Sequence, residues 1–147
     1  MSESHLKSML PAGSYAGKTV LITGGGTGLG KSVATYLASL GANIVITGRR
    51  AEVLQQTAQE MANATGAQVL AVAGDVRNIE DVERVLNESI TRFGRVDVLL
   101  NNAAGNFVSP TERLSHRAFE SVIGIVLQGT VNFTLTVGKY WIKENIK

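Results

Sequence analysis

The residues best suited to chemistry form a glycine-rich turn near the start of the chain. The turn, Thr23-Gly-Gly-Gly-Thr-Gly-Leu-Gly30, follows a β-branched run at 19–22 and precedes an amphipathic helical pattern. Glycines allow a sharp turn and close approach to a phosphate, and free N–H groups at a helix start attract negative charge. This order indicates a dinucleotide-binding site, although a flexible glycine loop is the simpler alternative. The expected cofactor contacts are Gly24, Gly25, Gly26, Thr27, Gly28 and Leu29.

Two arginines follow the second expected strand, in the segment Thr47-Gly48-Arg49-Arg50. In NAD sites a carboxylate about 20 residues after the glycines accepts hydrogen bonds from the ribose, whereas an arginine accommodates the 2′-phosphate of NADP. A guanidinium also matches phosphate geometry. The segment therefore favours NADPH and assigns Arg49 to the 2′-phosphate. The alternative is that the arginines only solvate a helix start, and we prefer that interpretation for Arg50.

The composition of the chain argues against several other classes of function. The chain has 147 residues, a net charge of +2 and 44% hydrophobic residues, which suits one globular domain. Basic residues are scattered, so no nucleic-acid partner is expected. With no cysteine and only His5 and His116, we expect no disulfide, thiolate or metal site. Apolar runs are interrupted before the ~20 residues of a membrane span, and no import signal is visible near the N-terminus.

Strands and helices alternate along the chain. Short apolar runs predict strands at residues 19–22, 43–47, 68–73 and 96–100. Helical spacing predicts helices at residues 28–40, 51–64, 79–93 and 116–141. Asn78 and Ser115 are expected N-caps, and Gly66 and Gly94 are expected helix stops. The last helix is expected to continue through three internal glycines.

These elements predict an α/β fold, the N-terminal part of a Rossmann-type doubly wound parallel sheet. Right-handed crossovers give the strand order 3-2-1-4 with helices on both faces. The order reverses between the first and fourth strands, so a ligand should lie where Gly24–Leu29 and Asn101–Gly105 converge. Residues 1–16 would form an N-terminal extension, and residues 17–147 the dinucleotide-binding domain.

The glycine turn together with Asn101-Asn-Ala-Ala-Gly105 resembles the short-chain dehydrogenase/reductase family. More narrowly, 23–31 and 101–115 are similar to mitochondrial-type 2,4-dienoyl-CoA reductases, and the likeness extends from Met9 to the last residue. The resemblance implies NADPH-dependent reduction of a 2,4-dienoyl-CoA to a 3-enoyl-CoA during oxidation of unsaturated fatty acids. It also implies a mitochondrial location, with the cytoplasm as the alternative, and a homotetramer when the protein is complete.

The resemblance assigns roles to individual residues. Asp75 would accept a hydrogen bond from the adenine amino group, and Asn102 and Ala103 would contact the cofactor. The Asn106 amide would donate to the thioester oxygen, where negative charge develops during hydride transfer. Acyl-CoA contacts would come from Arg49, Arg77, Phe107 and Ser115. The simpler alternatives are a turn or cap role for Asp75, a solvated Arg77, core packing for Phe107 and an N-cap role for Ser115.

One expected feature of the family does not occur in this sequence. The family places a Tyr-x-x-x-Lys pair after the next strand, where the lysine helps the tyrosine act as an acid. Here Tyr15 and Lys18, and Tyr140 and Lys143, are only three positions apart. We therefore expect the chain to stop before this segment and to be inactive alone. The rival interpretations are a non-catalytic nucleotide-binding or interaction module, and a short-chain reductase with another enoyl or carbonyl substrate.

Overall fold

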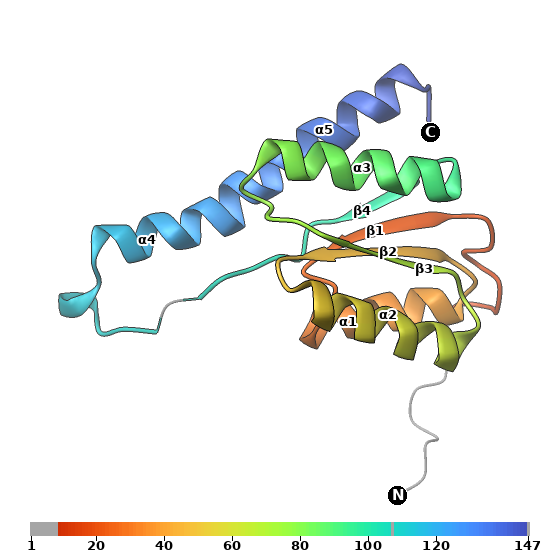
Figure 1. The fold of residues 1–147 in the computed structure, drawn as a ribbon, viewed down its shortest axis with the longest axis horizontal. Helices are drawn as coiled ribbons and strands as arrows, with labels where there is room; N and C mark the ends of the chain where they lie inside the picture. Colours follow the sequence, from red (N-terminus) through yellow and green to blue (C-terminus); the bar gives the residue numbers. More distant parts are fainter. Residues whose placement is uncertain (1–8, 107, 147) are drawn as a thin grey trace, which may run out of the picture.

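Four parallel strands form the centre of the fold, in a computed structural model that describes residues 9–106 and 108–146 (Figure 1). Their order is β3-β2-β1-β4, as the sequence predicted. The strands are β1 Thr19–Thr23, β2 Asn43–Gly48, β3 Val69–Ala73 and β4 Val98–Leu100. The α-helices are α1 Gly28–Ser39, α2 Ala51–Thr65, α3 Ile79–Phe93, α4 His116–Ile123 and α5 Gly129–Lys143.

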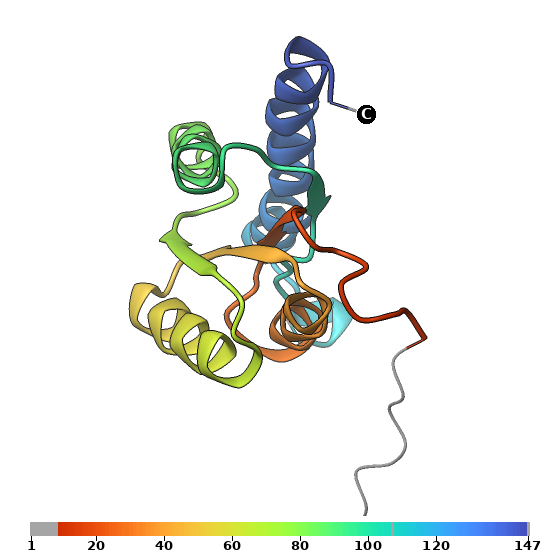
Figure 2. The same cartoon turned by 90° about the vertical axis from the view of Figure 1, so that its right-hand side faces the viewer.

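Helices cover both faces of the sheet, which confirms the expected doubly wound arrangement (Figure 2). All five residues of β1 are buried, and successive side chains point to opposite faces. Val20 and Ile22 pack with residues of α1 and α2, whereas Leu21 packs with residues of α3 and α5. β1 is thus an inner strand of the sheet that is covered on both faces.

The helix ends use the residues that the sequence indicated. The Asn78 side chain accepts a hydrogen bond from the backbone N–H of Asp81 at 2.9 Å, and Ser115 Oγ accepts one from Ala118 at 3.1 Å. Gly66 ends α2 with φ of 72° and Gly94 ends α3 with φ of 80°. Both values lie in the left-handed region, which favours glycine. The starts of α3 and α4 and the ends of α2 and α3 were therefore predictable from local residues.

The last expected helix is continuous from His116 to Lys143, but a π-helical segment at Gly124–Gln128 separates α4 from α5. Gly129 follows this segment and lies directly against the loop after β3. A Cβ there would be 2.4 Å from Cγ2 of Val76. The glycine that looked unfavourable for a helix is thus the residue that lets α5 approach the sheet.

This continuous helix is also long and apolar enough to cross a membrane, by length and composition alone. The sequence analysis expected no such segment. In the fold, its inner side contributes the buried residues Phe133 and Val137 to the core. The indole N–H of Trp141 donates to the carbonyl oxygen of Val96 at 2.7 Å. These contacts pack the inner side of the helix on the sheet, and 17% of its most apolar 18-residue window is buried.

We expect Gly129→Ala to destabilise the fold by about 1–3 kcal/mol, the usual cost of overpacking. The added methyl group would overlap with Val76, as described above. Gly138→Ala in the same helix is the matched control, because outside its chain neighbours and the nearby helix backbone no heavy atom of the described residues lies within 4 Å of its added Cβ. The control should gain up to about 1 kcal/mol, since alanine favours helix. Urea unfolding of both variants measures this, and equal stabilities would contradict the packing argument.

Candidate functional site

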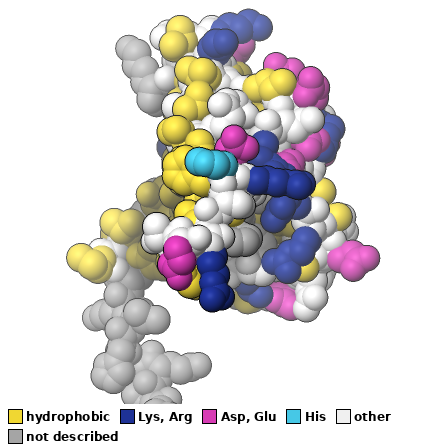
Figure 3. All heavy atoms as spheres, turned by 90° about the vertical axis from the view of Figure 1, so that its left-hand side faces the viewer, with side chains coloured by type: hydrophobic (Ala, Val, Ile, Leu, Met, Phe, Trp, Pro, Cys, Tyr) yellow, Lys and Arg dark blue, Asp and Glu magenta, His cyan; other side chains and the backbone are white. Residues whose placement is uncertain are grey.

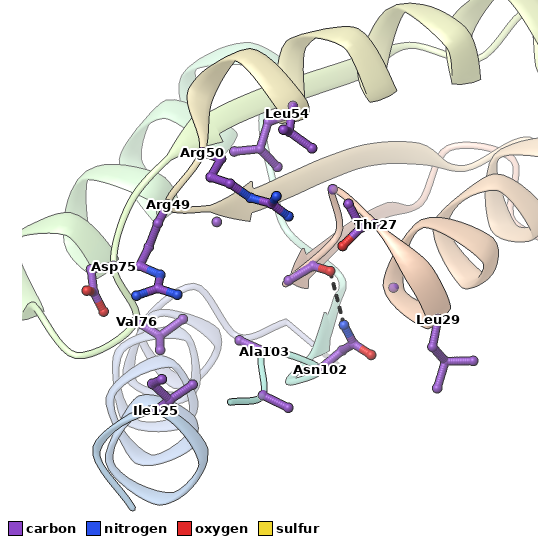
Figure 4. Close-up of a pocket in the computed structure, with 16 residues that line it drawn as sticks. Thr27, Leu29, Arg49, Arg50, Leu54, Asp75, Val76, Asn102, Ala103 and Ile125 are labelled. Carbon is purple, nitrogen blue, oxygen red and sulfur yellow. Dashed lines mark hydrogen bonds between the residues drawn. The ribbon is translucent and has the colours of Figure 1, made fainter. Parts of the chain in front are cut away.

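A pocket of about 600 Å³ opens at the carboxyl ends of the strands, in the expected crevice (Figure 4). Its wall combines the glycine turn after β1, the loops after β2, β3 and β4, and one residue of the π-helical segment. The lining residues that dominate the chemistry are Thr27, Arg49, Arg50, Asp75, Asn102 and Ala103. Parts of the chain that are far apart in sequence therefore meet in one site.

The glycine turn is shaped by contacts that exclude a side chain. At Gly25 a Cβ would lie 2.5 Å from Cγ2 of Ile46 on β2. At Gly30 it would lie 2.4 Å from the carbonyl oxygen of Gly24 and 2.5 Å from Nδ2 of Asn102. Such separations are far below van der Waals contact. The turn therefore packs α1 tightly against both β1 and the loop after β4.

The expected cofactor contacts of the turn fall into two groups. Gly24, Gly26, Thr27 and Leu29 line the pocket. Gly25 instead faces β2, and Gly28 does not belong to the pocket wall. Gly28 has φ of 54°, and no heavy atom of the described residues comes within 4 Å of the Cβ position. The structure therefore gives Gly28 a conformational role, and contact of Gly25 or Gly28 with a cofactor stays a prediction.

Reciprocal hydrogen bonds join the turn to the loop after β4. Oγ1 of Thr23 accepts hydrogen bonds from the backbone N–H groups of Asn102 and Ala103 at 3.0 and 2.9 Å. In return Nδ2 of Asn102 donates to the carbonyl oxygens of Thr23 and Gly24 at 3.0 and 3.2 Å. The sequence analysis treated Thr23 only as the start of the turn. Its position at a strand end opposite Asn102 is the signal that would have identified this role.

Arg49 and Arg50 supply the positive charge of the pocket. Figure 4 shows the Arg49 guanidinium on the side of Asp75 and the Arg50 guanidinium on the side of Thr27. Arg50 is also the N-cap residue of α2, where it makes no side-chain capping hydrogen bond. The sequence analysis preferred simple solvation for Arg50, but the structure brings it to the pocket. Two guanidinium groups at one end of a pocket suit a phosphate group.

Asp75 is the only carboxylate among the described residues that line the pocket. Arg77 holds this side chain, with Nε donating to Oδ1 and Oδ2 at 2.9 and 3.1 Å. The side-chain hydrogen bonds from Arg77 lower the pKa of Asp75, despite the opposing effect of burial. Arg77 itself does not line the pocket. Asp75 therefore stays ionised at neutral pH and can accept a hydrogen bond from a ligand amino group.

Asn106 and Ser115, two of the residues that the resemblance assigns to the substrate, lie on the segment between β4 and α4, which extends away from the sheet (Figure 1). Asn106 and Ser115 are exposed and do not line the pocket. Ser115 caps α4, which is the simpler alternative that the sequence analysis gave for this residue. Phe107 lies outside the described residues. The roles of Asn106, Phe107 and Ser115 with a substrate therefore stay predictions.

On the face shown in Figure 3, Lys and Arg side chains lie beside a band of hydrophobic ones, with Asp and Glu side chains among them. Basic clusters near a pocket raise the local concentration of anionic ligands. The described residues contain no group of three or more His, Asp or Glu placed to hold a metal ion. The surface thus suits a ligand that carries phosphates.

The chain is similar to known proteins over most of its length. Residues 18–146 match the family model for short chain dehydrogenases. A Caenorhabditis elegans protein named probable 2,4-dienoyl-CoA reductase 3, (3E)-enoyl-CoA-producing, is 44% identical over 137 residues, which cover 92% of this chain and 44% of the relative. The chain therefore spans less than half the length of that relative.

Solved structures share the same fold. A short chain dehydrogenase from Bacillus anthracis has a TM-score of 0.84 at 47% identity, covering 89% of this chain and 54% of that one. The L-sorbose reductase from Gluconobacter frateurii, complexed with NADPH and L-sorbose, has a TM-score of 0.81 at 26% identity. That match covers 88% of this chain and 49% of that one.

We expect Thr23→Val to weaken the link between the two loops. Loss of a buried acceptor leaves two N–H groups unpaired and costs about 1–3 kcal/mol. Thr19→Val is the matched control at the other end of β1, because the Thr19 hydroxyl is buried and has no hydrogen-bond partner among the described residues. The control should be neutral or slightly stabilising. Thermal unfolding and cofactor titration of both variants measure this, and equal effects would contradict the role of Thr23.

Proposed function

This chain belongs to the short-chain dehydrogenase family, and from that premise we propose that the full-length protein is an NADPH-dependent 2,4-dienoyl-CoA reductase. The observation that carries the proposal is the pocket at the carboxyl ends of the strands. There the glycine turn, two arginines and the Asn102 loop converge. The 44% identity to a relative named as a dienoyl-CoA reductase supports the substrate class.

The cofactor assignment rests on the fit of the residues to an anionic dinucleotide. Helix α1 starts at the pocket with no side-chain capping hydrogen bond and no acidic residue in its first turn. Its free N–H groups are therefore available to a pyrophosphate. Arg49, with Arg50 beside it, would hold the 2′-phosphate, and Asp75 would bind the adenine amino group. NADPH would supply the hydride when bound.

The proposed reaction determines which atoms of the substrate the protein has to contact. Conversion of a 2,4-dienoyl-CoA to a 3-enoyl-CoA adds hydrogen at C2 and C5 of the acyl chain. Hydride arrives at C5, because the electron pair then moves through the conjugated system to the thioester oxygen, and a proton is added at C2. In this proposal Asn106 donates a hydrogen bond to that oxygen. Arg77, Phe107 and Ser115 contact the acyl-CoA, with Arg49 also near its phosphates.

A second candidate is a short-chain reductase that acts on a carbonyl substrate. The likeness to L-sorbose reductase favours it, since that protein shares the fold of this chain. The two candidates share the cofactor pocket and differ only in the residues beyond β4. A non-catalytic nucleotide-binding module is a third possibility, and it would bind NADPH without turnover.

The proposal extends to the location and assembly of the protein. We propose a mitochondrial reductase that assembles from several copies of the chain. The outer side of the α4–α5 helix exposes the large apolar residues Phe119, Leu127 and Leu135. Contiguous apolar surface of this kind is usually covered in the working protein.

We expect the purified full-length protein to oxidise NADPH when a 2,4-dienoyl-CoA is added, measured as loss of absorbance at about 340 nm. The 147-residue chain alone should show no turnover, because its sequence has no Tyr-x-x-x-Lys pair to assist proton transfer. Such groups contribute about 10²- to 10⁴-fold. Turnover by the short chain above a no-enzyme control would contradict the proposed need for the remaining segment. Turnover of a ketone instead of the dienoyl-CoA would favour the second candidate.

We expect Arg49→Ala in the full-length protein to weaken NADPH binding by about 1–3 kcal/mol, the scale of a charge-assisted hydrogen bond. NADH binding should change little, because NADH has no 2′-phosphate. Titration calorimetry without acyl-CoA separates this effect from any contact with the substrate. Arg92→Ala is a control that removes a positive charge from the last turn of α3. An equal loss for both cofactors would contradict the assignment of Arg49.

A further inference from the structure

The loop that carries Asp75 is held in place from α3. The backbone N–H of Asp75 donates to Oδ2 of Asp81 at 2.9 Å, across six residues of chain. The backbone N–H of Asn78 donates to the carbonyl oxygen of Asp75 at 3.0 Å and closes the turn. The main chain at Asp75 is thus bound on both its N–H and its C=O group.

Arg84 extends this contact to the end of β3. Its NH2 group donates to Oδ1 of Asp81 at 2.6 Å and to the carbonyl oxygen of Ala73 at 2.7 Å. The hydrogen bonds that its carboxylate accepts from the Asp75 backbone and from Arg84 lower the pKa of Asp81, so this carboxylate is ionised at neutral pH. Arg84 and the carboxylate of Asp81 therefore connect the backbone of Ala73 with the backbone of Asp75.

Helix capping does not account for this arrangement. In a reciprocal capping box the side chain at the position of Asp81 binds the backbone N–H of the N-cap residue, which is Asn78. Here that N–H is bound by the carbonyl oxygen of Asp75, and the Asp81 carboxylate reaches back to the loop instead. Arg77 fixes the side chain of Asp75 separately. Different residues thus set its backbone position and its side-chain direction.

We propose that Asp81 and Arg84 are positioning residues for the adenosine end of the cofactor. Neither residue lines the pocket. Both act by holding Asp75 in its position in the pocket wall. The inference rests on the proposed function, because it assumes that adenine binds at Asp75. Loss of the link would let Asp75 move relative to Arg49, and the adenosine end would bind less tightly. Chemistry at the nicotinamide end would be unchanged once NADPH is saturating.

The test uses the full-length protein and two probes, NADPH and 2′,5′-ADP, which has the adenosine and the 2′-phosphate but no nicotinamide. Asp81→Ala should raise the dissociation constants of both probes about three- to tenfold, the effect of one lost hydrogen bond. Asp81→Asn retains an acceptor oxygen and should recover part of the loss. The KM for NADPH should rise in parallel, while kcat and the KM for dienoyl-CoA stay within about twofold.

Glu88→Ala is the matched control. Glu88 accepts a hydrogen bond from Arg84 at 3.3 Å, and among the described residues it makes no hydrogen bond to the Asp75 loop. It should leave both dissociation constants unchanged. A lower melting temperature with unchanged affinity for 2′,5′-ADP in Asp81→Ala would overturn the proposal and leave Asp81 a structural residue. Failure of the wild-type protein to bind 2′,5′-ADP would instead overturn the proposed NADPH function, and this inference with it.

Discussion

The rest of the structure depends on how closely α1 approaches the end of β1. At Gly30 even a methyl group would overlap with the carbonyl oxygen of Gly24 and the amide of Asn102. Because no side chain intervenes, Asn102 can hydrogen-bond to the backbone at the end of β1, and the Thr23 hydroxyl can bind the Asn102 loop in return. The strand order reverses on either side of β1, so this contact lies where a crevice forms in such sheets. The close contact between α1 and the end of β1 therefore positions the loops that line the pocket.

The same kind of close packing forms the opposite wall. A Cβ at Gly105 would lie 2.6 Å from Cδ1 of Ile125, and one at Gly129 would lie 2.4 Å from Cγ2 of Val76. Both contacts involve residues beside or within the π-helical segment, which interrupts the α4–α5 helix next to the pocket. Such segments are frequent at functional sites because they change the direction of side chains along a helix. Here the segment places Ile125 in the pocket wall.

Much of the fold could be predicted because its signals are local. A cap such as Asn78 or a stop such as Gly94 acts on its own helix, and an apolar run identifies a buried strand. The pocket residues directly after strands, including Arg49, were predictable for the same reason. The link from Asp81 to Asp75 and the position of Ile125 depend on tertiary contacts, and no periodic pattern reports them. Asn106 came from family resemblance alone, and the structure places it outside the pocket wall.

If NADPH binds as proposed, the pocket holds a 2′-phosphate as well as the Asp75 carboxylate. An unpaired Asp75 would repel a phosphate held by Arg49, since both would be negatively charged at neutral pH. Arg77 prevents this, because it binds both oxygens of the carboxylate from outside the pocket. The positive charge of Arg49 and Arg50 is then available to the phosphate, while Asp75 keeps a free lone pair for an amino group. Since this pairing lowers the pKa of Asp75, the arrangement persists until the pH falls below the ordinary range of an aspartate.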